Sequence, residues 1–146
     1  MLRLTNDTLG MALHIALYQR LLAFCQQYTP EFPAEPIVQN WLTRLYNGDD
    51  TLYIVVTLDS AYNITHHSLI EVTENFGYRV VFCHQTMIDK GSTAKLDEVM
   101  EYLDKLAEQQ EAVCISATVS KNVKVYEKKY GYTQSRVSIV KWKTDM

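Results

Sequence analysis

The stretch AVCISATVSKNVKVYEKKYGYTQSRVSIV, residues 112–140, decides how the rest of the chain is interpreted. Its first part is short and mostly apolar, which is typical of a strand with both faces mostly covered. Ser120 is a candidate N-cap for a helix in which Tyr126 and Tyr130 lie one turn apart, and Gly131 can adopt the left-handed conformation that ends a helix. A β-branched run follows. The stretch therefore predicts a strand, a short basic helix and a closing strand.

Length and charge limit the class of protein. A chain of 146 residues predicts one domain, 1–146, that buries about two-thirds of the surface of its unfolded form. The net charge of -3 argues against general nucleic-acid binding, which depends on neutralising many phosphates.

Cysteine placement and hydropathy indicate the compartment. Cys25, Cys83 and Cys114 lie singly in apolar segments, which predicts buried thiols in a reducing compartment, with no disulfide framework and no metal site. The N-terminus lacks a secretory pattern, and no run reaches the roughly 18 apolar residues that span a membrane. We therefore expect a cytoplasmic protein that does not enter a membrane.

Periodicity predicts the order of elements upstream of residue 112. Apolar residues recur at helical spacing within residues 11–25, 37–45 and 96–107. Strand-like runs occupy residues 52–58, 64–73 and 78–85. Their short connections predict an antiparallel meander. The strand near residues 113–118 should then return parallel to 78–85 through a right-handed crossover. Ser92 or Thr93 is the predicted N-cap of the helix from 96.

The C-terminal third carries a family resemblance in a few residues. These are Asn122, Tyr126, Glu127, Lys128, Gly131 and Tyr132. The order of strand, helix with Tyr-Glu-Lys, Gly-aromatic and strand resembles the C-terminal half of the GCN5-related N-acetyltransferase (GNAT) family. The wording YEKKYGY is most similar to small bacteriophage-encoded members. The resemblance implies an α/β (α+β) fold with a mixed, mostly antiparallel sheet and helices on both faces.

The chain departs from the family in three places. The pyrophosphate loop has one glycine, out of register, in the segment 89–94. The spacing of Asn122, Tyr126 and Gly131 differs from the family helix. The segment 132–143 leaves room for one long strand or a very tight pair. Each departure weakens the case for activity more than the case for the fold.

The resemblance implies acetyl-CoA as co-substrate. Its pantetheine arm would lie along the fourth strand, against Phe82, Cys83, His84 and Gln85. Its pyrophosphate would lie on the amides that precede the next helix. The residues implied there are Gly91, Ser92, Thr93 and Ala94, flanked by Lys90 and Lys95, and Asn122 completes the implied cofactor-binding set. The alternative is that this segment is only a loop and a helix cap.

Three side chains are candidates for the chemistry. Tyr126 would be the general acid that protonates the departing thiolate. His84 is the candidate base for the incoming ammonium because imidazole titrates near neutral pH, with Glu71 as the second candidate. The alternatives are a core tyrosine and a hydrogen-bonded strand-end histidine. His66 and His67 are adjacent, so they point to opposite faces of a strand and do not form a shared metal site.

Two functions remain open at this stage. The first is an acyl-CoA-dependent N-acyltransferase that modifies a small-molecule or protein amine. The second is a catalytically silent GNAT-fold binding or assembly protein, in a phage particle if the bacteriophage similarity holds, with a homo-oligomer or a phage assembly partner and the host cytoplasm as its location. Lysines 121, 124 and 128 form a basic stripe beside Lys129. That stripe is either a solvated helix face or a surface for a CoA phosphate or an acidic partner.

Overall fold

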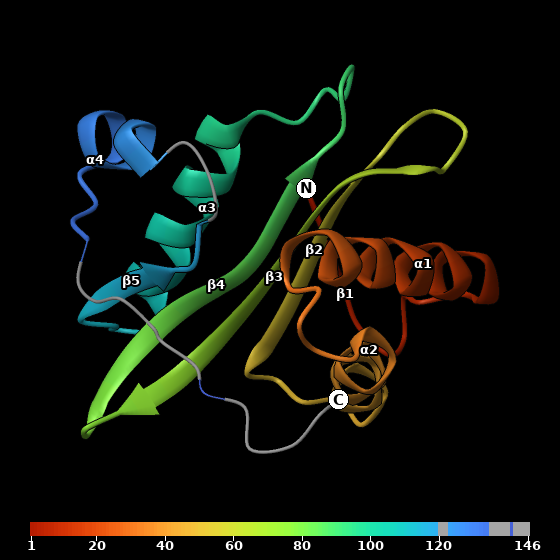
Figure 1. Cartoon of the computed structure of the whole chain (residues 1–146), viewed down its shortest axis with the longest axis horizontal. Helices are drawn as coiled ribbons and strands as arrows, with labels where there is room; N and C mark the ends of the chain where they lie inside the picture. The colour runs from red at the N-terminus through yellow and green to blue at the C-terminus, as the bar shows by residue number, and fades with distance from the viewer. Residues whose placement is uncertain (120–122, 135–140, 142–146) are drawn as a thin grey trace.

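The computed structural model describes residues 1–119, 123–134 and 141, which form a five-stranded sheet with helices on both faces (Figure 1). The strands are β1 (Leu2–Leu4), β2 (Leu52–Leu58), β3 (Ile64–Asn75), β4 (Tyr78–Ile88) and β5 (Cys114–Ala117). The helices are α1 (Met11–Tyr28), α2 (Ala34–Tyr46), α3 (Leu96–Gln109) and α4 (Val123–Tyr130). Within the described ranges no helix is long and apolar enough to cross a bilayer.

The sheet has the order β1-β2-β3-β4-β5. The first three pairings are antiparallel, and β5 returns parallel to β4 after α3. The turns are built for this path. The Asp59 carboxylate accepts the amides of Ala61 and Asn63 between β2 and β3, and Gly77 adopts a φ of 81° between β3 and β4. The predicted meander, the parallel return and the mixed, mostly antiparallel sheet are confirmed.

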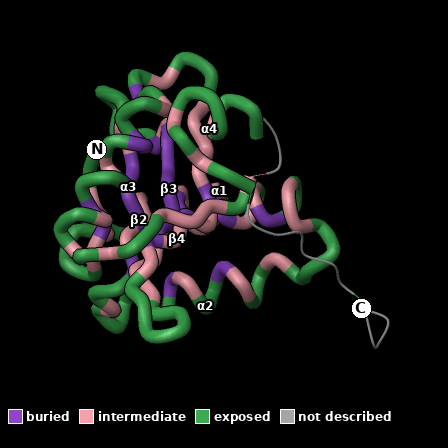
Figure 2. The backbone as a smooth tube through the Cα atoms, turned by 90° about the vertical axis from the view of Figure 1, so that its left-hand side faces the viewer, coloured by how far each residue is buried: buried purple, intermediate pink, exposed green. Residues whose placement is uncertain are grey.

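Strand alternation supplies two cores, one on each face of the sheet. Helices α1 and α2 cover one face, and α3 and α4 lie on the other (Figure 1). In β2, Ile54 and Val56 enter the core under α1 and α2, whereas Val55 enters the core under α3. This follows from the period of two residues in a strand. The buried segments of the chain therefore lie in the strands and on the inner sides of the helices (Figure 2).

The start of α3 differs from the prediction. The helix begins at Leu96, so Lys95 and not Ser92 or Thr93 is the N-cap residue. The Glu98 carboxylate accepts the Lys95 amide at 3.0 Å. Ser92 closes the loop before it, since its Oγ accepts the Ala94 amide at 3.1 Å. The sequence pattern therefore identified Ser92, which caps the turn before α3 and not the helix itself.

The covering of β5 also differs from the prediction. Cys25 and Cys83 are buried, but Cys114 is exposed. Ile115 packs into the core under α3, so the neighbouring Cys114 side chain points to the opposite face of the sheet. Burial of all three thiols is therefore wrong for Cys114, and β5 is less covered than the predicted strand with both faces mostly covered. The predicted cap Ser120 and most of the predicted closing strand, 132–143, lie outside the described residues.

A β-bulge in β4 changes the direction of its side chains. Ile70 pairs with Cys83 but Leu69 pairs with Gln85, so His84 is an extra residue in β4. A bulge places two consecutive residues on one side of the strand. His84 accordingly contacts Trp41 of α2, and Gln85 contacts Cys25 of α1. Cys83 and Thr86 point to the other face, toward α3 and α4.

Candidate active site at the gap between β4 and β5

The two parallel strands separate part-way along β4. Their pairing ends at Cys83 and Ala117, whereas β4 continues to Ile88. Within the described residues, the edge of β4 from His84 to Ile88 thus has no strand partner. The sequence places the free edge at Phe82–Gln85, but Phe82 and Cys83 pair with β5. The open segment therefore begins two residues later than predicted.

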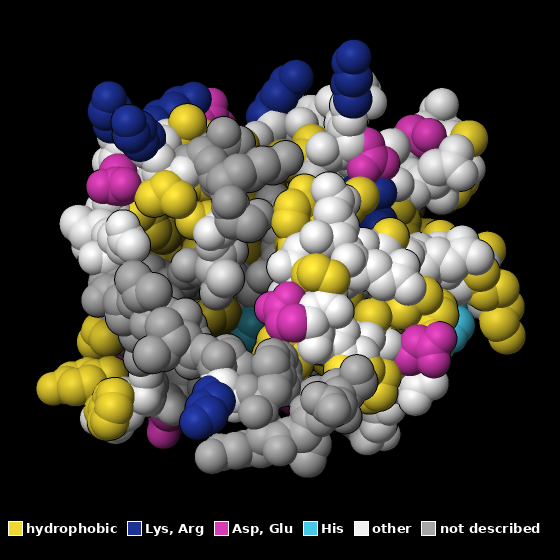
Figure 3. Space-filling view, viewed as in Figure 1, with side chains coloured by type: hydrophobic (Ala, Val, Ile, Leu, Met, Phe, Trp, Pro, Cys, Tyr) yellow, Lys and Arg dark blue, Asp and Glu magenta, His cyan; other side chains and the backbone are white. Residues whose placement is uncertain are grey.

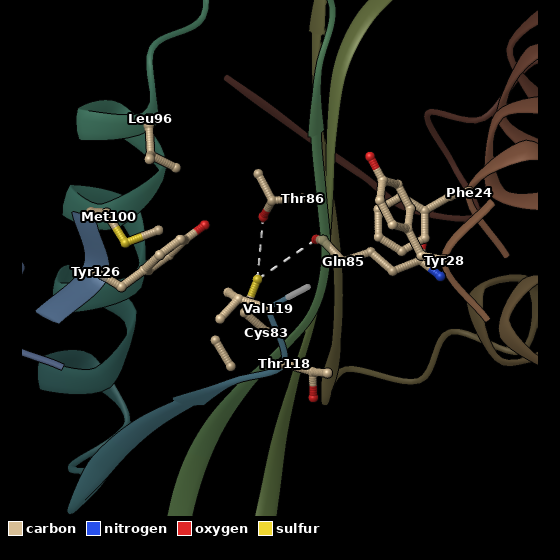
Figure 4. Close-up of a pocket in the computed structure, with 11 residues that line it drawn as sticks. Phe24, Tyr28, Cys83, Gln85, Thr86, Leu96, Met100, Thr118, Val119 and Tyr126 are labelled. Atoms are coloured by element: carbon tan, nitrogen blue, oxygen red, sulfur yellow. Dashed lines mark hydrogen bonds between the residues drawn. The ribbon is translucent and has the colours of Figure 1, made fainter. Parts of the chain in front are cut away.

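A pocket of about 120 Å³ occupies this gap. It extends through the sheet edge from α1 to α3 and α4 (Figure 4). Its lining comprises Phe24, Tyr28, Cys83, Gln85, Thr86, Leu96, Met100, Ala117, Thr118, Val119 and Tyr126. Cys83, Gln85 and Tyr126 belong to the sequence-predicted set. The structure therefore brings the predicted acid to the predicted strand edge.

Tyr126 overlooks the gap from α4. Its hydroxyl points toward β4 in the space beside Thr86 (Figure 4). Among the residues that the structure describes, this hydroxyl has no hydrogen-bond partner. Burial raises the pKa of the phenol, with smaller contributions from Cys83 and Tyr130. The ring packs edge-on against Tyr132, with centroids 5.8 Å apart. Tyr126 is therefore a protonated hydrogen-bond donor, positioned by its packing against Tyr132, and its hydroxyl faces the open edge of β4.

Cys83 forms the floor beneath the gap. Its Sγ lies 3.3 Å from Thr86 Oγ1 and donates toward the Gln85 carbonyl at 3.6 Å. Burial raises the pKa of this thiol. Because the thiolate is the nucleophilic form, Cys83 is a neutral wall of the pocket.

The loop before α3 lies at one end of the open edge. It contains Gly91, with a φ of 87°, and exposed Lys90, Thr93 and Lys95. The amides of Ser92, Ala94 and Lys95 already donate to Asp89, Ser92 and Glu98. Free amides at a helix start belong to its first turn. The amides of Ser92 and Ala94 are therefore occupied, and the first-turn amides of Leu96 and Asp97 extend the predicted anion-binding segment.

Charge around that helix start is mixed. Lys and Arg side chains gather along the upper edge of the molecule, above α4 and the loop before α3 (Figure 3). Two carboxylates, Asp97 and Glu98, occupy the first turn of α3. Asp97 pairs with Lys129 at 3.1 Å and accepts the Tyr130 hydroxyl at 2.5 Å. Lys129, which lies beside the predicted basic stripe, therefore holds α4 against α3. Asn122 lies outside the described residues.

His84 and Glu71 lie together, but away from the pocket lining. His84 Nε2 is 3.1 Å from Glu71 Oε1, and Glu71 also pairs with Arg44 at 2.7 Å. The His84 ring contacts Trp41 and Phe82, with centroid distances of 4.8 and 4.4 Å. Burial lowers the pKa of His84, and Glu71 partly offsets it. The ring faces α2 and not the gap because it alternates with Cys83, which points toward α3.

A buried polar network that the sequence did not indicate fixes the wall near α1. Arg20 donates from Nε to His67 Nδ1 at 2.8 Å and binds both oxygens of Asp89 at 2.8 and 2.9 Å. It also donates to the carbonyls of Ile64 and Met87. All five guanidinium N–H groups are therefore used.

The same network sets the orientation of Gln85. Because Arg20 donates to His67 Nδ1, the proton of the neutral ring is on Nε2, which donates to Gln85 Oε1 at 3.2 Å. Gln85 Nε2 then donates to Cys25 Sγ at 3.6 Å. Burial, and secondarily Arg20, lowers the pKa of His67 to about 3. His66 instead bonds Ser68 on the other side of β3, which agrees with the opposite faces predicted for this pair.

Comparison with known proteins shows the fold. No family model matches the chain, and no curated protein sequence matches it. Solved structures do. A predicted acetyltransferase with acetyl-CoA from Clostridium acetobutylicum has a TM-score of 0.69 at 14% identity, covering 95% of this chain and 92% of that one. The fold is that of the GNAT-like acetyltransferases.

Two further neighbours have named acceptors. Glucosamine-6-phosphate N-acetyltransferase from Arabidopsis thaliana has a TM-score of 0.66 at 14% identity, covering 93% of this chain and 95% of that one. An aminoglycoside acetyltransferase from an uncultured soil metagenomic sample has a TM-score of 0.63 at 12% identity, covering 99% and 97%. At these identities the likeness concerns the backbone, and function has to be argued from the site.

Proposed function

We propose that this protein is an acyl-CoA-dependent N-acyltransferase that moves an acetyl group from acetyl-CoA to a primary amine. The observation that carries the proposal is the open edge of β4 beyond the Cys83–Ala117 pair, with the Tyr126 hydroxyl directed at it. A strand edge offers a row of backbone donors and acceptors, which suits the amides of a pantetheine arm. The acetyltransferase fold of the neighbours supports the same reading.

The chain has groups suited to both ends of acetyl-CoA. His84, Gln85 and Thr86 would bond the pantetheine through their backbone. The first-turn amides of α3 would receive the pyrophosphate, since a helix start favours anions. The exposed side chains of Lys90 and Lys95 would add positive charge there. Asn122 remains a predicted contact.

Transfer then needs one acid and one base. The amine nitrogen attacks the thioester carbonyl carbon, the C–N bond forms and the C–S bond breaks, and Tyr126 gives its proton to the departing sulfur. We assign the proton lost by the amine to His84, whose ring is hydrogen-bonded to Glu71. The ring lies on the α1/α2 face of the sheet and outside the pocket lining, so a water molecule would carry the proton to it. Acid and base would act from opposite faces, and positioning would supply roughly 7 to 11 kcal/mol of the acceleration.

One observation favours the alternative, a silent binding or assembly protein. Asp97 and Glu98 place two carboxylates in the helix turn that should receive the pyrophosphate, and like charges there oppose an anion. A phage assembly role, a homo-oligomer and a cytoplasmic location remain predictions from the sequence.

Ligand-dependent stability separates the two functions. We expect acetyl-CoA and CoA to raise the melting temperature, because a ligand at a hundred times its dissociation constant adds about 2.7 kcal/mol. The double variant Lys90→Ala, Lys95→Ala should reduce this rise. The control Lys105→Ala removes an exposed lysine of α3 that pairs with Glu101 and should leave the rise unchanged. No rise at millimolar CoA would leave the assembly role.

A further inference from the structure

The pocket has an aromatic wall on the side of α1. Phe24 and Tyr28 lie one turn apart on α1, with ring centroids 4.6 Å apart. The Phe24 ring also meets His67 edge-on, with an interplanar angle of 78°. His67 is anchored by Arg20. Both rings line the pocket on the side of β4 opposite Tyr126 (Figure 4). Phe24 and Tyr28, the aromatic wall, therefore face the gap, and the contact of Phe24 with the hydrogen-bonded His67 ring fixes its position.

The same wall carries no charge. Among the residues that the structure describes, the pocket lining contains no Asp, Glu, Lys, Arg or His. The nearby ions are already paired, Arg20 with Asp89 and Arg44 with Glu71. A second ionic group on an acceptor would thus lose water without gaining a partner, which is costly.

Gln85 adds one polar group to the pocket, a side-chain amide whose orientation is fixed by its hydrogen bonds. Its Oε1 accepts from His67, and one proton of its Nε2 goes toward Cys25. The second Nε2 proton remains available, since an amide nitrogen carries two. Gln85 is 8% exposed and lines the pocket. It therefore offers one amide N–H and one remaining lone pair of Oε1 to a bound molecule, and it carries no charge.

We infer that the acceptor is a small primary amine with an uncharged aromatic body, seated against Phe24 and Tyr28 with its nitrogen toward the gap. This rests on the proposed acetyl transfer. Aromatic faces attract a neighbouring ring and also a cation, so they suit an aryl-alkyl ammonium. A polycationic aminoglycoside or a sugar phosphate lacks matching charges here.

The test compares acceptors with acetyl-CoA held constant. Thiol release is measured with 2-phenylethylamine, spermidine, glucosamine 6-phosphate and a lysine-containing peptide, and acetyl-CoA binding is measured separately by melting temperature. We expect kcat/KM for 2-phenylethylamine to exceed each of the others by about tenfold or more. If acetyl-CoA binds but 2-phenylethylamine is not the best acceptor, the inference fails and the proposed function stands. If acetyl-CoA does not bind, both fail.

Variants of the aromatic wall give a second readout. Phe24→Leu keeps an apolar side chain but removes the ring face, so kcat/KM for 2-phenylethylamine should fall about tenfold while KM for acetyl-CoA stays within about twofold. Phe76→Leu is the matched control, because Phe76 is 91% exposed in the β3–β4 turn and lies outside the pocket. The melting-temperature rise with acetyl-CoA verifies that each variant is folded. Equal rates for the two variants would overturn the role of the wall.

Discussion

The α1/α2 face of the sheet holds its helices by deep burial and a complete polar network, whereas the α3/α4 face ends in a helix with no buried residue. Leu17, Leu21 and Cys25 of α1 are buried, and Arg20 joins α1 to β3 and β4. By contrast, α4 is held by half-buried tyrosines and by contacts of Lys129 and Tyr130 with Asp97.

This difference separates two tasks. The rigid face supplies the proposed acceptor wall, since its side chains are locked by packing and hydrogen bonds, which a binding site requires. Helix α4 has no buried residue and few contacts with the rest of the protein, so the proposed acid, Tyr126, lies on an element of lower local stability. Elements that adjust around a ligand are commonly of that kind. The predictions below test this division.

The largest expected effect concerns the polar network. Arg20→Met should lower the free energy of unfolding by about 1–3 kcal/mol, because His67 and two carbonyls lose their donor while Asp89, whose side chain is 38% exposed, can be hydrated. Urea denaturation measures the change. Lys105→Met breaks an exposed pair with Glu101 and should cost less than about 1 kcal/mol. Equal losses would mean that the two faces are not held differently.

The buried histidines should make the protein sensitive to acid. Burial is the main cause that lowers the pKa of His66 to about 4 and that of His67 to about 3. In the unfolded state the pKa of both imidazoles returns to about 6.5. The unfolded state therefore binds more protons than the folded state as the pH falls below about 6.5.

The sign follows from that proton uptake. Stability should fall with decreasing pH from about 6.5 toward 4, by up to about 1.4 kcal/mol per pH unit for each histidine. Denaturation at several pH values measures the slope, and His67→Gln should reduce it by about half. A slope that His67→Gln leaves unchanged would show that the ring is not held neutral.

The next effect tests the α4 side. Tyr126→Phe should slow thiol release about a hundredfold, the usual lower range for a general acid, with little change in the stabilisation by CoA. Tyr130→Phe is the matched control, since its hydroxyl donates to Asp97 and not to the gap. Similar rates for both variants would remove Tyr126 from the chemistry.

The smallest effect asks whether the α1/α2 face takes part in proton transfer. A neutral His84 is the proposed base, so the rate should fall as the pH drops through its pKa, which burial holds below 6.5. His84→Gln should abolish this acid limb and lower the rate by about a hundredfold at most, the lower range for a base in direct contact, because the proton reaches His84 through water. Glu71→Gln should move the limb to lower pH, because Glu71 raises the pKa of His84. An unchanged profile in His84→Gln would exclude the water-relayed route.

Local pattern identified the elements and much of the α3/α4 side of the site. The apolar periodicity of α1 and α3, the short turns of the meander and the helix around Tyr126 are encoded within a few residues, so they could be predicted. Phe24 and Tyr28 also had a signal, an aromatic pair one turn apart, but nothing local linked it to β4. Arg20 resembled any charged residue of an amphipathic helix, because its partners lie more than forty residues away.

The sequence by itself determined the order of elements, the antiparallel meander and the parallel return of the fifth strand, and its family resemblance named Tyr126 as a candidate. Only the tertiary structure decided where β4 separates from β5, that Gln85 lies on the same face as His84, and which side chains form the acceptor wall. The physical reason is that these features depend on contacts between segments distant in the sequence. The bulge opposite Leu69 and Ile70 is one of them, because one extra residue in β4 reverses the alternation of side chains from Gln85 onward.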